Sequence, residues 1–226
     1  MSLSITHDGS VTTVLLDRPN KAHAYDRALL EALQSCFRGL DATVVVIGST
    51  GQGAFCAGAD LQEMKHATPQ DARNLLSQAV FEELAQLSAV TIAAVQGPAV
   101  AGGFELALAC DLRIAGPNAR FSLPEVSLGL IPSAGGCTRL PDLVGPSRAK
   151  EVILGGRKLS ASEAVHWGIV ARIEPDPLAA AQAWAQEISS ADPTALSLAK
   201  TVLRGNHSDR LDLERLAQTT LYARKS

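Results

Sequence analysis

The chain has few aromatic side chains and no excess of positive charge. Aromatic residues make up 4% of its 226 residues, and the formal net charge is −3 at pH 7. Proteins that bind a phosphate backbone usually carry a basic stripe, and proteins that bind single strands stack the bases on aromatic rings. We therefore expect no nucleic-acid partner.

Cysteine and histidine are also sparse and widely spaced. The four cysteines form no C-x-x-C pair, and the five histidines show neither H-x-H nor H-x-x-x-H spacing, so we expect a reducing compartment and no metal site. No apolar run reaches the length of about 18 residues that a membrane helix needs, and the N-terminus lacks the basic and apolar parts of a signal peptide. We expect a cytoplasmic protein that does not contact a membrane.

What the sequence does contain is the composition of an ordinary globular protein. Hydrophobic residues make up 46% of the chain and charged residues 19%. A chain of this length buries roughly 70% or more of its unfolded surface, so it needs neither a disulfide nor a metal to stabilise a core.

The periodicity of apolar residues switches between strand and helix along the first 145 residues. Asp8-Gly9 predicts a tight turn between two short strands within residues 3–16. Helical patterns are expected at 28–40, 69–87, 103–110 and 136–140, and strands at 43–47, 90–95 and 112–115. This alternation favours an α/β fold with a covered sheet. Residues 146–226 are mostly helical by pattern, so we expect an α/β core of 1–145 followed by a helical C-terminal region.

Two glycine-containing stretches, 55–61 and 97–105, occupy turns between a strand and a helix. Such turns expose backbone N–H groups, and a helix that starts near Gly102 directs its unpaired donors at any bound group. Two such turns that face each other would form an oxyanion hole. The alternative is that these glycines only permit tight turns and close packing. Neither stretch has the spacing of a phosphate-binding loop.

Two glutamates lie near these turns. Glu105 follows the second turn in a segment that has no other charge from Gly97 to Cys110, and Glu125 follows Pro124 in the next strand-to-turn region. A carboxyl among apolar neighbours has its pKa raised toward the range that is useful for proton transfer. The alternatives are that Glu105 only complements a helix dipole and that Glu125 is a solvated loop acid.

Taken together, these motifs resemble those of the crotonase superfamily, specifically the enoyl-CoA hydratase/isomerase group. The resemblance spans about residues 10–200 in family order. The five stretches that carry it are 16–21, 55–61, 93–107, 110–115 and 121–140.

The resemblance implies a crotonase-like α/β spiral of ββα units with a helical C-terminal region that is truncated relative to the family. It also implies an acyl-CoA thioester substrate and a homotrimer or dimer of trimers. Ala59 and Gly102 match the residues whose N–H groups bind the thioester oxygen. Glu105 matches the acid that activates water, and Glu125 matches the acid that protonates C2. The family requires no metal, and no cofactor beyond the coenzyme A of the substrate.

Other matched positions line the coenzyme A pocket of the family, largely through their main chains. At two positions of the same region, His23 and Tyr25, the chain departs from the usual Asn and Leu. We interpret His23 as a rim residue. The predicted substrate-binding residues are Ala22, Ala24, Ala57, Gly58, Asp60, Leu61, Gly103 and Pro124.

The function predicted from these residues is that of a lyase, an enoyl-CoA hydratase that adds water in syn fashion across the C2–C3 double bond of a 2-enoyl-CoA. One alternative is an enoyl-CoA isomerase, or other crotonase-type acyl-CoA chemistry, which needs only one of the acids. A third possibility is a non-catalytic acyl-CoA-binding subunit. The acyl group and the pathway, of which fatty acid metabolism is one, do not follow from the sequence because pocket shape decides them.

Overall fold

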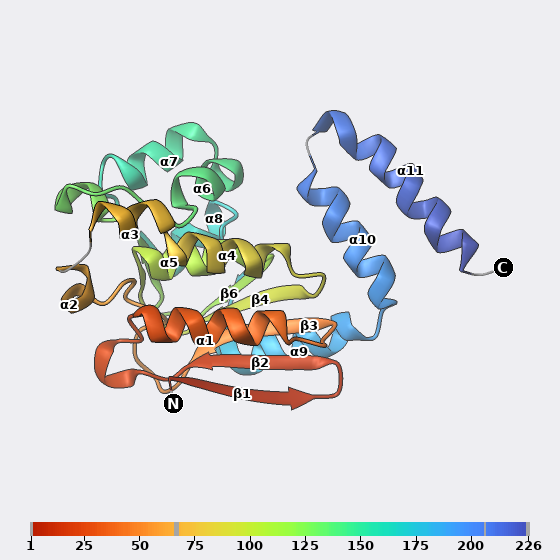
Figure 1. Ribbon diagram of the computed structural model, residues 1–226, viewed down its shortest axis with the longest axis horizontal. Coiled ribbons are helices and arrows are strands. Elements are labelled where there is room, and N and C mark those ends of the chain that lie inside the picture. Colours follow the sequence, from red (N-terminus) through yellow and green to blue (C-terminus); the bar gives the residue numbers. More distant parts are fainter. Residues whose placement is uncertain (1, 66–67, 206, 225–226) are drawn as a thin grey trace.

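A mixed sheet forms the centre of the computed structural model, which describes residues 2–65, 68–205 and 207–224 (Figure 1). Within these residues the sheet has six strands in the order β1-β2-β3-β4-β6-β9, of which only β1 and β2 pair antiparallel. The strands are β1 (Leu3–Asp8), β2 (Val11–Leu16), β3 (Val44–Ser49), β4 (Val90–Val95), β6 (Leu112–Ala115) and β9 (Arg172–Ile173).

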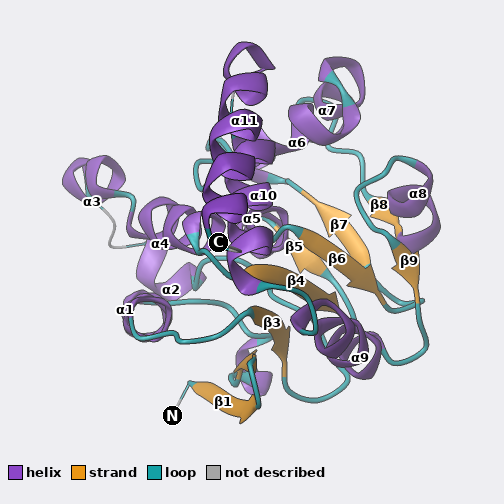
Figure 2. Cartoon of the chain, turned by 90° about the vertical axis from the view of Figure 1, so that its right-hand side faces the viewer, coloured by secondary structure: helices purple, strands orange, loops and turns teal. Residues whose placement is uncertain are grey.

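Helices cover both faces of this sheet, which explains the uninterrupted apolar run of β3. Val45 and Ile47 belong to a core cluster shared with α1 (Arg27–Arg38) and α4 (Leu76–Gln86). Val44 and Val46 point to the other face, where α9 (Pro177–Ser189) packs (Figure 2). The predicted α/β layering is therefore confirmed.

A second, smaller sheet positions the functional segments. Among the described residues it has three strands, β5 (Ala99–Val100), β7 (Arg120–Ser122) and β8 (Leu159–Ser160). β5 and β7 run parallel, and Cys56 joins Ala99 through a parallel bridge. Three chain segments therefore run side by side in one direction, so the residues that follow each of them meet at one end.

The helix boundaries differ from the sequence prediction in one place. The prediction of a single helix over 69–87 is wrong, because this range forms two helices, α3 (Pro69–Asn74) and α4. Leu75 separates the two with φ of 29°, outside the helical region, so the axis cannot continue through it. α5 (Gly102–Ala109) begins where the glycine pattern predicted and is buried on all sides.

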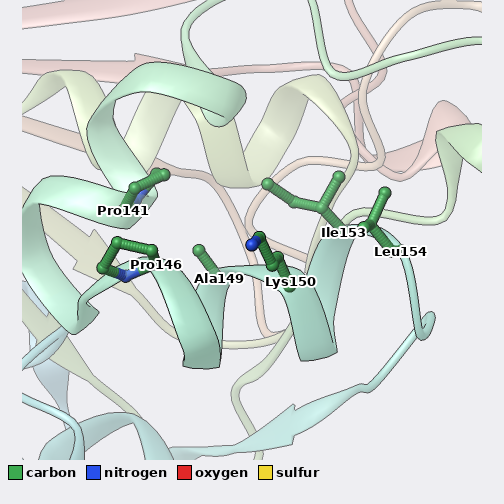
Figure 3. Close-up of a pocket in the computed structure, with 6 residues that line it drawn as sticks. All are labelled: Pro141, Pro146, Ala149, Lys150, Ile153 and Leu154. Carbon is green, nitrogen blue, oxygen red and sulfur yellow. The ribbon is translucent and has the colours of Figure 1, made fainter.

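Most of the chain after residue 145 is helical. Among the described residues its helices are α7 (Pro146–Ile153), α8 (Ala161–His166), α9, α10 (Pro193–Arg204) and α11 (His207–Ala223), and α6 (Gly136–Val144) lies just before it. α6 and α7 enclose an apolar recess of about 170 Å³ (Figure 3). β8 and β9 also lie in this region and complete the two sheets, so the division at residue 145 remains a prediction.

α10 and α11 lie together at one side of the molecule (Figure 1). An ion pair between a buried lysine and a half-buried aspartate attaches α10 to the sheet: Lys200 Nζ lies 2.5 Å from Asp111 Oδ2 and donates to the Ala89 carbonyl at 2.7 Å. A buried lysine without its partner would destabilise the folded state, so this ion pair fixes where α10 docks. No helix within the described residues has both the length and the apolar composition needed to cross a bilayer.

Candidate active site

The 56–60 turn presents one backbone amide to the site. The Tyr25 N–H donates to the Gly58 carbonyl at 2.8 Å, and the Asp60 N–H donates to the Tyr25 carbonyl at 2.7 Å. In parallel pairing of this kind the N–H of the intervening residue, Ala59, points away from Tyr25. Within the described part of the chain this N–H has no acceptor, so it is available to a ligand.

The turn before α5 presents a second amide. Gly102 is the first residue of the helix, and its N–H has no acceptor among the residues that the structure describes. Ala101 adopts φ 52° and ψ −128°, a left-handed conformation that is strained for alanine, and its N–H donates to the Ser122 carbonyl. Strain of this kind is retained where the surroundings require one chain direction, here the direction of the Gly102 N–H.

These two turns are in direct contact. A Cβ atom placed on Gly58 would lie 3.1 Å from the Gly102 nitrogen, and one placed on Gly103 would lie 2.0 Å from the Cys56 carbonyl oxygen. Both glycines are therefore required for the close approach of the turns. The structure brings the 58–60 and 101–103 segments together, and the binding of one oxygen by their two amides stays a prediction.

Glu105 is buried on the first turn of α5, with 3% of its surface exposed. Its Oε1 accepts hydrogen bonds from the N–H groups of Ala134 and Gly136, each at 2.8 Å. Burial raises the pKa of Glu105 above its ordinary value, although the two backbone donors and the charge of Arg139 oppose this effect. The carboxyl is thus held in one orientation by the start of α6.

Glu125 lies at the start of a 3₁₀ helix, η2 (Glu125–Leu128), and only 8% of its surface is exposed. Burial, together with the smaller effect of the negative charge of Glu105, raises the pKa of Glu125 to about 7. Its Oε2 is buried and has no hydrogen-bond partner in the described residues. A buried carboxyl oxygen without a protein partner can accept a hydrogen bond from a bound group or from water. The solvated-loop alternative for Glu125 is wrong.

The remaining predicted residues surround the first turn. The Ala57 N–H donates to the Ala22 carbonyl at 3.0 Å, and the Ala24 carbonyl accepts from Arg18. Asp60 caps the N-terminus of α2 (Leu61–Met64) and pairs with Arg18 at 3.4 Å. These contacts hold the 22–25 loop against the 57–60 turn.

Two further predicted residues lie at the edges of this arrangement. Leu61 is exposed and begins α2, and Pro124 precedes η2, where its carbonyl accepts from Ser127. His23 is buried, and its Nδ1 accepts from the Arg18 N–H. The interpretation of His23 as a rim residue is therefore wrong, because the positive-φ conformations of Ala22 and His23 turn this side chain inward.

Sequence reasoning missed three residues of the site. Ala134 and Gly136 hold Glu105, and the repeated glycines at 135 and 136 were the only signal for them. A Cβ on Gly136 would lie 3.0 Å from Glu105 Oε1, so glycine is needed for this approach. Tyr25 stood out in the sequence only as a departure from leucine, yet its side chain reaches Gly102.

No group of three or more His, Cys, Asp or Glu side chains is placed to hold a metal ion in the described ranges. The groups that the site does offer are two free amides and two buried carboxyls of raised pKa. Such a set can stabilise negative charge on an oxygen and move protons at neighbouring atoms.

Known proteins are similar to this chain in sequence and in fold. The family model "Enoyl-CoA hydratase/isomerase" matches residues 6–225. A probable mitochondrial enoyl-CoA hydratase 2 of Arabidopsis thaliana is 42% identical over 204 residues, which cover 87% of this chain and 68% of the relative. The carnitinyl-CoA dehydratase of Salmonella typhi is 37% identical over 210 residues, which cover 90% of this chain and 80% of the relative.

Solved structures agree with these matches. The enoyl-CoA hydratase of Bacillus anthracis superposes with a TM-score of 0.92 at 36% identity, over 97% of this chain and 90% of that one. A putative enoyl-CoA hydratase of Thermobifida fusca YX, solved in complex with acetoacetyl-CoA, gives 0.90 at 29% identity, over 99% and 95%. The predicted crotonase-like fold is therefore confirmed.

The predicted enzyme class also agrees with these relatives, because hydratases and dehydratases are both lyases. The sequence match extends over nearly the whole chain and the structural match over the whole fold. The chain therefore belongs to the enoyl-CoA hydratase/isomerase family.

Proposed function

We propose that the protein is an enoyl-CoA hydratase that adds water in syn fashion across the C2–C3 double bond of a 2-enoyl-CoA thioester. This proposal is supported by one observation: two buried carboxyls, Glu105 and Glu125, occur in the same site as the amides of Ala59 and Gly102, which have no acceptor among the described residues. An isomerase needs only one acid, whereas hydration uses one group to activate water and another to protonate carbon.

The proposed reaction begins with the thioester oxygen bound by the two amides. Glu105 removes a proton from water while the water oxygen forms a bond to C3, and the electrons of the double bond move onto the thioester oxygen. The two amides stabilise this enolate more than they stabilise the substrate. The enolate then takes a proton from Glu125 at C2. Because the reaction moves only protons and water, it calls for no cofactor beyond the coenzyme A of the substrate.

The substrate class is supported by relatives whose names or titles refer to CoA thioesters. One such structure was solved with acetoacetyl-CoA, and another relative is named a carnitinyl-CoA dehydratase. Dehydration is the reverse of the proposed reaction and requires the same two acids. We therefore propose acyl-CoA thioesters as substrates in both directions.

A panel of 2-enoyl-CoA thioesters of increasing chain length tests the proposed function. Hydration removes the conjugated double bond, so the ultraviolet absorbance of the substrate should fall with time. Chromatography should then show the corresponding 3-hydroxyacyl-CoA. Binding of every thioester with no turnover of any would instead support a non-catalytic acyl-CoA-binding subunit.

The pH dependence of hydration should follow the two carboxyls. Glu125 must be protonated to act as the acid, and its pKa is raised to about 7, so kcat/KM should fall as the pH rises above this value. Glu105 must be ionised, so kcat/KM should also fall on the acid side, at a pH above the ordinary range of carboxyls. A profile that stays flat from about pH 6 to about pH 9 would contradict this assignment.

We also propose the homotrimer or dimer of trimers that the family resemblance implies, and a cytoplasmic location. Light scattering coupled to size exclusion measures the oligomer mass directly. A mass of one or two chains at micromolar concentration would contradict the trimer.

A further inference from the structure

Tyr25 contacts both turns that present the free amides. Its backbone N–H and carbonyl pair with Gly58 and Asp60, which sets the direction of the Ala59 N–H between them. Its side chain crosses to the other turn, where it lies against Gly102. One residue thus links the two halves of the predicted oxyanion hole.

The side-chain contact with Gly102 is close and involves the end of the ring. A Cβ atom placed on Gly102 would lie 1.9 Å from the Tyr25 hydroxyl oxygen, 2.7 Å from Cζ and 2.8 Å from Cε1. The phenol therefore fills the space in which a side chain at position 102 would lie. Since the first turn of α5 is packed against this ring, the ring limits how far Gly102 can move.

The ring itself has little freedom. Tyr25 is 7% exposed, and its ring meets that of Phe81 on α4 edge to face, with centroids 5.6 Å apart. Burial raises the pKa of the Tyr25 hydroxyl above its ordinary value, and the nearby ionisable groups of Cys56, Glu105 and Glu125 raise it further, while a hydrogen bond with the Ser77 side chain opposes this effect. The phenol thus remains neutral, and it lies close enough to the two carboxyls for their charges to affect its pKa.

We propose that Tyr25 is a positioning residue of the oxyanion hole: its backbone holds the Ala59 turn, its ring holds the Gly102 turn, and together they fix the spacing of the two amides. The proposal rests on the proposed function only in that the amides bind a thioester oxygen. It adds a residue that acts through packing and does not take part in proton transfer.

The physical reason is that an oxyanion hole depends on geometry. Donors stabilise the enolate only when both lie within about 2.7–3.1 Å of the same oxygen. A shift of about 1 Å at a reacting group can lower the rate about a hundredfold. Replacing Tyr25 by leucine removes the end of the ring that contacts Gly102, while the backbone contacts with the 58–60 turn remain.

Three variants separate positioning from general loosening of the core. Tyr25→Leu removes the contact with Gly102, and Tyr25→Phe keeps the ring but removes the hydroxyl. Phe81→Leu is the matched control for a loosened core, because it removes the aromatic partner of Tyr25 but leaves the Tyr25 phenol itself against Gly102. Thermal unfolding of each variant reports its stability separately from its activity.

The most specific measurement is the infrared carbonyl stretch of bound butyryl-CoA labelled with ¹³C at the thioester carbon. This saturated thioester cannot be hydrated, so the signal does not depend on turnover. Hydrogen bonds from two well-placed amides lower the stretching frequency in the wild-type protein. Tyr25→Leu should lose most of this lowering and about tenfold to a hundredfold in kcat with little change in KM.

Tyr25→Phe should lose much less than Tyr25→Leu in both measurements, and Phe81→Leu should lower the unfolding temperature but keep the carbonyl shift. The proposal is wrong if Tyr25→Leu retains the wild-type shift, if Phe81→Leu loses as much of it, or if Tyr25→Phe is as impaired as Tyr25→Leu. If Tyr25→Leu does not fold, Gly102→Ala displaces the same ring from the other side and must also reduce the shift.

The same experiments distinguish a failure of the proposed function from a failure of this inference. A wild-type protein that lowers the carbonyl frequency in a Tyr25-dependent way, but hydrates no enoyl-CoA, would keep this inference and refute the hydratase. A wild-type protein that shows no carbonyl shift would refute the oxyanion hole and this inference with it.

Discussion

Replacing Glu105 by glutamine should lower kcat for hydration by about 10²–10⁴-fold. Glutamine cannot accept the proton of water, which is the role that hydration assigns to Glu105. The fold should change little, because the amide oxygen of glutamine can still accept from the N–H groups of Ala134 and Gly136. The loss should therefore appear in kcat with substrate binding largely retained.

Steady-state kinetics with a 2-enoyl-CoA, together with titration of butyryl-CoA, separates these effects. Glu31→Gln is the matched control, because this glutamate is exposed on α1 and pairs only with the exposed Arg27 among the described residues. It should leave kcat unchanged. If Glu105→Gln lost hydration but still moved the double bond of a 3-enoyl-CoA, the isomerase alternative would be favoured.

Replacing Glu125 by glutamine should also lower kcat by about 10²–10⁴-fold, because an amide has no proton to give to C2. This variant should in addition lose the fall of the pH profile above about 7 that we assign to Glu125. The loss of a single limb of the profile is a sharper criterion than the loss of rate, because a general disturbance of the pocket would not produce it.

The same substitution should also change how the stability of the folded protein depends on pH. The pKa of Glu125 is raised in the folded state, so the folded protein binds more protons than the unfolded chain between the ordinary carboxyl range and about pH 7. Wild-type stability therefore decreases as the pH rises through this window. Glu125→Gln does not titrate, so it should unfold at a higher temperature relative to wild type at pH 8 than at pH 5. An equal difference at both pH values would contradict the raised pKa.

The main elements of the fold could be predicted from the sequence because their signals are local. The Asp8-Gly9 pair is typical of a tight turn between two strands, and the continuous apolar run of β3 is typical of a strand covered on both faces. β5 and β7 were not predicted, since two or three residues are too short to show a period. These short strands nevertheless align the site, because their parallel pairing brings the Gly102 and Glu125 turns to one end.

The candidate site could be predicted in part for a similar reason. Glycine turns and isolated carboxyls are visible along the chain, so Gly102 and Glu105 could be named in advance. The contact between Tyr25 and Gly102 joins residues far apart in the sequence, and no periodic pattern encodes it. The inward orientation of His23 likewise depends on positive φ angles, which alanine and histidine at these positions do not predict.

In the proposed reaction, two amides and two carboxyls act on one enoyl thioester. Turnover of crotonyl-CoA in ²H₂¹⁸O, followed by mass spectrometry and NMR at early times, tests it most directly. The product should be a 3-hydroxybutyryl-CoA with one ¹⁸O on C3 and one deuterium on C2, added to the same face. Deuterium in the acyl chain without ¹⁸O, or no conversion of the crotonyl-CoA at all, would contradict this reaction.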